Sequence, residues 1–112
     1  MSREKIVAYQ QDQLTTLRGY LAALYVPTFL TADHNGQPCL EITDHNARTR
    51  RIYVQVVFYW FYWGDQPDER TSTIHLPMAA EDIAAAVRRG WREGEQGTLN
   101  IDLGSIRGAH GR

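Results

Sequence analysis

The segment from Arg51 to Trp63 constrains the fold most, because apolar side chains occupy both of its alternating sets. In a β-strand, successive side chains point to opposite faces of the sheet. One set is apolar throughout: Ile52, Val54, Val56, Phe58, Trp60 and Tyr62. The other set is polar at Arg51 and Gln55, and its remaining members are Tyr53, Val57, Tyr59, Phe61 and Trp63. We therefore expect one long strand with a core face and a second face that also avoids water.

Flanking segments predict three more strands. Asn35-Gly36 is a strong hairpin signal between strands at 28–32 and 39–43, since this pair adopts the positive φ angles of a tight turn. Leu40 and Ile42 should then share one face of the second strand, and Cys39 and Glu41 the other. After a turn at 64–68, residues 71–76 predict the fourth strand, with Ile74 and Leu76 on one side.

Two helices are expected on either side of these strands. Leu14, Leu17, Leu21 and Leu24 recur at spacings of three and four, which predicts a helix over 3–25. A second helix over about 79–92 is indicated by Ile83, Val87 and Trp91, with Pro77 at its start. The predicted fold is α+β, with an N-terminal helix, a four-stranded antiparallel meander and a C-terminal helix.

The length of 112 residues suits one domain, which we place at 1–94. Residues 95–112 form a glycine-rich tail, expected to be flexible, in which Leu99, Ile101 and Leu103 alternate with polar residues. That alternation predicts one short strand, which could add to a sheet edge.

Composition excludes several classes of protein. The single Cys39 excludes an internal disulfide framework and a multi-cysteine zinc site. No apolar run approaches the roughly 20 residues that cross a bilayer, and no signal peptide is present, so we expect a cytoplasmic protein without membrane contact. The net charge of −1 argues against a strongly basic nucleic-acid binder.

The second face of the long strand predicts a binding surface. If both helices cover the first face, the second would expose a patch larger than soluble monomers usually show. Its cover could be the tail, a second copy in a homodimer, or a regulatory protein; alternatively, helices on both sides would make this a core strand. The predicted partner-binding residues are Tyr53, Val57, Tyr59, Phe61 and Trp63.

Candidate chemical sites are weaker. Asp33-His34-Asn35 and Asp44-His45-Asn46 could ligate a metal, but the predicted strand between them separates them by about 20 Å, and these are common turn residues. Cys39 and His75 could form a nucleophile–base pair, yet an intervening strand would hold them about 9–10 Å apart. We expect no catalytic residue, metal or cofactor.

Two further functions remain as alternatives. Arg48, Arg50 and Arg51 lie beside aromatic residues and could bind single-stranded nucleic acid, a function that the net charge disfavours. A small enzyme or ligand-binding domain would instead use the aromatic residues to line a pocket. Nucleotide-binding, zinc-protease and serine-hydrolase motifs are absent from the sequence.

Four short runs carry a resemblance to known proteins: Gln37 to Ile42, Arg50 to Val54, Trp60 to Gly64, and Ala84 to Arg89. In these runs the chain resembles a group of small actinobacterial α+β proteins that often lie beside helix-turn-helix regulators. The predicted order of elements is also similar to small dimeric secretion-chaperone-like folds. Both resemblances imply a non-enzymatic protein-protein interaction module, with an accessory regulatory or chaperone-like role.

Overall fold

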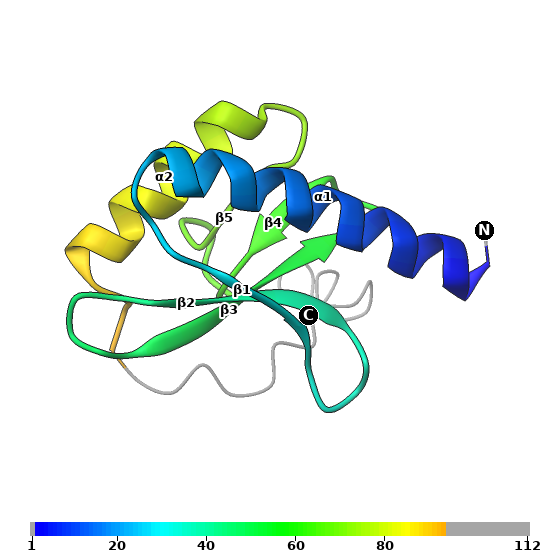
Figure 1. Cartoon of the computed structure of the whole chain (residues 1–112), viewed down its shortest axis with the longest axis horizontal. Coiled ribbons are helices and arrows are strands. Elements are labelled where there is room, and N and C mark those ends of the chain that lie inside the picture. The colour runs from blue at the N-terminus through cyan, green and yellow to red at the C-terminus, as the bar shows by residue number, and fades with distance from the viewer. Residues whose placement is uncertain (1, 94–112) are drawn as a thin grey trace.

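The computed structural model describes residues 2–93. Its elements are α1 (Arg3–Ala23), β1 (Phe29–Ala32), β2 (Pro38–Thr43), β3 (Thr49–Gln55), β4 (Trp60–Tyr62), β5 (Arg70–Ser72) and α2 (Leu76–Arg89). The strands form an antiparallel meander in the order β1-β2-β3-β4-β5 (Figure 1). The predicted tail at 95–112 and its strand at Leu99–Leu103 lie outside the described residues. Neither described helix is long and apolar enough to cross a membrane.

Both helices pack on the same face of the sheet (Figure 1). Leu14, Leu17 and Leu21 of α1 are buried, which confirms the predicted helical stripe. Leu40 and Ile42 of β2 lie on this core face with Ile52 and Val54 of β3, while Cys39 belongs to a separate cluster on the opposite face. The α+β class, the antiparallel meander and the two flanking helices were therefore predicted correctly.

The prediction of four strands was wrong, because the segment from Arg51 to Trp63 is not one strand. β3 ends at Gln55, the chain turns over residues 56–59, and β4 returns along β3. Val54 then pairs with Phe61, and both side chains are buried in the core. A straight strand from Arg51 to Trp63 would extend roughly 43 Å. Its far end would then project beyond a short helix packed across the sheet. Folding back instead buries the aromatic residues of the second half.

The helix boundaries differ from prediction by up to one turn. α1 ends at Ala23, before the Pro27 that we took as its stop. The N–H of Val26 donates to the carbonyl of Leu21 at 2.9 Å, and Tyr25 adopts a left-handed φ of 63°. This is the Schellman pattern of helix termination, in which glycine usually occupies the left-handed position. α2 starts at Leu76, earlier than predicted, with Pro77 in its first turn and Gly90 as its C-cap.

A buried side-chain hydrogen bond holds α1 against the sheet. Pro38 has no N–H to donate, and continuing the β2–β3 register places it opposite Val54. The side-chain amide of Gln10 donates instead to the Val54 carbonyl, at 3.2 Å. Gln10 interrupts the leucine stripe of α1, and this bond explains why a polar residue is buried there.

Candidate functional site

The five predicted partner-binding residues do not form one surface. Phe61 and Trp63 are buried in the core with the helices, because the turn after β3 reverses which side chains face inward. Tyr53 lies on the opposite face of the sheet and is also buried. Val57 and Tyr59 lie in the turn between β3 and β4 and are exposed. The prediction of one continuous aromatic surface is therefore wrong. Of its five residues, only Val57 and Tyr59 are exposed.

Exposed apolar side chains flank this turn in a second segment. Ile74 lies in the connection from β5 to α2, and Met78 lies in the first turn of α2. Their side chains are 67% and 61% exposed, against 59% for Val57 and 53% for Tyr59. The N–H of Thr73 donates to the carbonyl of Tyr59 at 2.8 Å, which ties the two segments together. We call Val57, Tyr59, Ile74 and Met78 the turn patch.

Sequence reasoning missed half of the turn patch. Ile74 was predicted to lie in a strand over 71–76, on the same side as Leu76, and Met78 just before a helix over about 79–92. In the structure β5 ends at Ser72, and Met78 is in the first turn of α2. The available signal was Pro77, because proline favours the first turn of a helix and so indicates a helix start near residue 76.

Tyr59 is displayed from an unusual backbone conformation. Its φ of 56° lies in the left-handed region, which costs a non-glycine residue roughly 1–2 kcal/mol. Next to it, Phe58 stacks on Trp60 at 5.1 Å between ring centroids, and the guanidinium of Arg70 lies 4.1 Å from the Trp60 ring. Strained backbone conformations are often found at functional sites.

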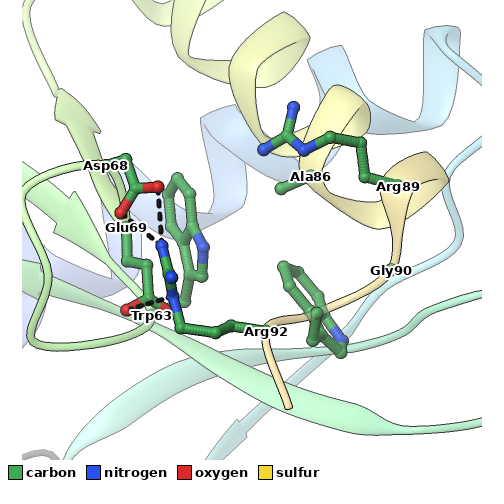
Figure 2. Close-up of a pocket in the computed structure, with 8 residues that line it drawn as sticks. Trp63, Asp68, Glu69, Ala86, Arg89, Gly90 and Arg92 are labelled. Atoms are coloured by element: carbon green, nitrogen blue, oxygen red, sulfur yellow. Dashed lines mark hydrogen bonds and ion pairs between the residues drawn. The ribbon is translucent and has the colours of Figure 1, made fainter.

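A cavity of about 280 Å³ lies at the C-terminal end of α2 (Figure 2). Trp63 and Trp91 contribute tilted rings with centroids 6.4 Å apart. The remaining lining residues are Asp68, Glu69, Ala86, Arg89, Gly90 and Arg92. Trp91 is held in place because its indole N–H donates to the Ile42 carbonyl at 3.2 Å. The cavity therefore has one firmly positioned aromatic wall.

The acidic groups beside the cavity are already paired. Glu69 is buried and its carboxylate lies 2.6 Å from a guanidinium nitrogen of Arg50 and 3.6 Å from Arg92. Arg92 also binds both carboxylate oxygens of Asp68, at 2.8 and 2.7 Å (Figure 2). A Cβ at position 64 would fall 2.3 Å from the Glu69 carboxyl carbon, so Gly64 is needed for this close approach. Among the described residues Arg89 forms no ion pair, and its side chain lies on the α2 side of the cavity, apart from Asp68 and Arg92 (Figure 2).

A small buried cluster lies on the face of the sheet opposite the helices. Cys39, Tyr53 and Tyr62 form a small buried group there, with the two tyrosine rings stacked at 5.6 Å. The Tyr53 hydroxyl donates to Asp33 at 2.8 Å. Burial raises the pKa of the Cys39 thiol to about 11 and that of Tyr62 to about 12. A thiol in this state is a weak nucleophile at neutral pH.

The arrangement does not bring the proposed catalytic pair together. Cys39 lies on the face opposite the helices, whereas His75 is the N-cap of α2. Residues 2–93 also contain no group of three or more His, Cys, Asp or Glu side chains that could hold a metal ion. The two Asp-His-Asn tripeptides each form a turn at an end of β2, as predicted.

The three arginines of the predicted basic cluster, Arg48, Arg50 and Arg51, interact with other groups of the protein. Arg50 is buried against Glu69, and Arg48 donates to the Trp91 carbonyl at 2.8 Å. Arg51 lies 3.5 Å from the carboxylate of Glu41. Each guanidinium thus has a protein partner, which weakens the alternative of a phosphate-binding surface.

Comparison of the chain with protein-family models, with curated proteins and with solved structures finds no significant match.

Proposed function

We propose that this protein is a non-enzymatic interaction module that pairs with a second copy of itself through the turn patch, as a cytoplasmic accessory protein. The supporting observation is that four exposed apolar side chains lie on two segments joined by a backbone hydrogen bond between Thr73 and Tyr59. Tyrosine is among the residues that most often dominate binding energy at interfaces. Tyr59 is the expected anchor.

The chemistry of the turn patch favours a second copy over a charged partner. Residues 56–59 carry no charge, and neither do Ile74 and Met78. A two-fold axis brings each surface against its own equivalent, so like charges near the axis would repel. An uncharged apolar patch meets its own copy without this penalty. The test can also show that the turn patch binds a regulatory protein with an apolar groove instead of a second copy.

The test is the mass of the full chain in solution, measured by sedimentation equilibrium over a wide concentration range. We expect a dimer, and we expect Tyr59→Gly to raise its dissociation constant about tenfold or more, the loss typical of an interface anchor. Glycine also relieves the left-handed φ, so the variant should melt at the same temperature as the wild type or higher. Folding and association are thereby separated.

Ala47→Gly is the matched control. Ala47 has a left-handed φ of 63° in the β2–β3 turn, outside the turn patch. This variant should dimerise like the wild type. A monomer at all concentrations, or a Tyr59→Gly dimer as tight as the wild type, would overturn the proposal. A monomer that binds a different protein in a Tyr59-dependent way would transfer the role to that partner.

The cavity supports a second candidate function, binding of a small aromatic anion. Its two indole walls and Arg89 suit a planar ring bearing a carboxylate. It ranks second because Trp63 and Trp91 are each only 3% exposed, which leaves little ring surface for a ligand. Benzoate would serve as the probe: quenching of tryptophan fluorescence that Arg89→Gln weakens would support this function, and no saturable response would exclude it for this ligand class.

A further inference from the structure

β1 forms one edge of the sheet, because among the described residues it pairs only with β2. The N–H of Asp33 donates to the Gln37 carbonyl at 2.9 Å, so these two residues form a hydrogen-bonded pair at the end of the hairpin. Hydrogen-bonded and non-hydrogen-bonded pairs alternate along an antiparallel ladder. The backbone groups of Thr31 therefore bond to β2, whereas those of Leu30 and Ala32 point away from β2, along the outer edge.

The proline of β2 supports this orientation independently. Pro38 lies opposite Ala32 and has no N–H to donate. The two residues cannot exchange both hydrogen bonds of a hydrogen-bonded pair, so theirs is a non-hydrogen-bonded pair. The N–H and the carbonyl of Ala32 are thus directed at the outer edge of β1, and those of Leu30, two residues earlier in the strand, are directed the same way.

The two edges of the described sheet differ in how they are protected against pairing with another strand. Proteins guard exposed edges with charged side chains, prolines, bulges or a covering element. β5 begins with Arg70, and its Thr71 hydroxyl donates to Asp82 of α2 at 2.8 Å. β1 contains no charged residue and no proline, and its register with β2 is continuous. Of these two edges, that of β1 is therefore the one open to pairing.

The side chains at this edge would gain from a neighbouring strand. Phe29 is 62% exposed and lies opposite Glu41, on the face away from the helices. Leu30, on the helix side, is only partly buried and packs against the core. A strand added to β1 would therefore cover apolar surface on both faces of the sheet.

We propose that the outer edge of β1 pairs antiparallel with the β1 edge of a second copy, which joins two sheets into one. A two-fold axis beside Leu30 lets each Leu30 exchange two backbone hydrogen bonds with its equivalent, and sets Phe29 opposite Thr31 of the second copy. Residues 20–32 carry no charge, so like charges do not meet across the axis. The β1 edge shares no residue with the turn patch. It would therefore link dimers formed through the turn patch into larger assemblies, and the two interfaces can be tested separately.

The experiment isolates this interface in the full-length Tyr59→Gly variant, whose turn patch is weakened. Sedimentation equilibrium should still show a dimer as its concentration is raised. Adding Ala32→Pro removes an N–H that points at the second copy, and should raise the dissociation constant of this dimer about tenfold or more. The melting temperature should stay within about 2 °C, because the lost N–H makes no bond to β2. Thr31→Pro is the matched comparison: it removes an N–H that bonds to β2, and should lower the melting temperature by roughly 5 °C or more.

A charge at the edge gives a second variant that does not depend on a backbone change. Phe29→Lys supplies the guard that β1 lacks, and should weaken the same dimer about tenfold while the exposed position keeps the fold intact. Gln66→Lys is its control, since it adds the same charge at an exposed position in the β4–β5 connection, at the other end of the sheet. This control should dimerise like the Tyr59→Gly background.

The outcomes separate this proposal from the proposed function. A Tyr59→Gly variant that stays monomeric at all concentrations would overturn pairing through β1 and leave the turn patch as the interface. Association that Tyr59→Gly leaves unchanged and Ala32→Pro abolishes would support pairing through β1 and overturn the role of the turn patch. Leu30 and Ala32 amides that resist hydrogen exchange equally in the monomer would also overturn the proposal, because another segment of the same chain would then occupy the edge.

Discussion

The tripeptide Asp-His-Asn occurs twice, at residues 33–35 and 44–46, and builds the same turn at opposite ends of β2. In the first turn, Asp33 Oδ1 accepts from the backbone N–H groups of Asn35 and Gln37, both at 2.9 Å. Asp44 Oδ1 accepts from the equivalent N–H groups, two and four residues further on, at the same distances. The repeat therefore reflects a shared way of closing a hairpin rather than a shared ligand.

The two turns differ in the second carboxylate oxygen and in the left-handed residue. Asp33 Oδ2 accepts from the hydroxyl of Tyr53, whereas Asp44 Oδ2 accepts from the backbone N–H of Trp91, 2.8 Å away in each case. Gly36 has a φ of 80° in the first turn, where Ala47 has 63° in the second. Residues near each turn therefore determine its shape. Residues distant in the sequence supply the hydrogen-bond donor to the second carboxylate oxygen.

The largest expected effect comes from replacing each aspartate by asparagine. At position 44, one amide NH₂ must face a backbone N–H in either orientation, because Trp91, Asn46 and Arg48 can only donate there. We expect Asp44→Asn to lower the free energy of unfolding by ~2–3 kcal/mol. At position 33 the NH₂ can donate to the Tyr53 hydroxyl, which also accepts, so Asp33→Asn should cost below ~1 kcal/mol.

Urea unfolding of the two variants, monitored by circular dichroism, measures this difference. Equal losses would mean that the Trp91 anchor contributes no more than the tyrosine hydrogen bond. Tyr53→Phe is the matched control, since it removes the partner of Asp33 and leaves the Asp44 turn intact. It should reproduce the smaller loss.

The left-handed positions should respond in opposite directions. Ala47→Gly removes the steric cost of a positive φ and should stabilise the protein by ~0.5–1 kcal/mol, after allowing for the greater freedom of glycine in the unfolded chain. Gly36→Ala introduces the same cost and should destabilise by about 1 kcal/mol, since nothing within 4 Å obstructs the new Cβ. Thermal melts of the pair check the sign, and changes of the same sign would contradict the prediction.

The same contrast shows how far sequence reasoning reached. Asn35-Gly36 and the polar run after Thr43 contain turn-forming residues, and both turns were predicted. The turn between β3 and β4 contains Val57, Phe58 and Tyr59, which carry no local turn signal and favour strands. It forms because pairing Val54 with Phe61 buries both side chains, a benefit that depends on the helices overhead.

That single missed turn also explains the outcome at the candidate site. Reversing the chain after Gln55 moved Phe61 and Trp63 into the core and left Val57 and Tyr59 exposed. Alternation along a strand can identify which side chains share a face, but one unpredicted turn changes every assignment beyond it. The cavity beside Trp91 could not be predicted either, because its walls come from the connection between β4 and β5, from α2 and from the residues that follow α2.

The smallest expected effect is on how the free energy of unfolding changes as the pH is lowered. Burial alone would raise the pKa of each aspartate, but the backbone N–H groups of the turn, with Tyr53 at Asp33 and Trp91 at Asp44, outweigh it and hold both pKa values below 3.8. A carboxylate whose pKa is lower in the folded state stabilises fully above its unfolded pKa and less as pH falls through the folded pKa. Wild-type stability should therefore decline below about pH 4.

Asp33→Asn removes one of these two titrating groups, so its stability should decline less steeply between about pH 5 and pH 2, by a margin below ~1 kcal/mol. Tyr53→Phe keeps the Asp33 carboxylate and its two backbone donors, and should follow a curve closer to the wild type. If Asp33→Asn runs parallel to the wild type throughout, the turn hydrogen bonds of Asp33 do not stabilise its charged form.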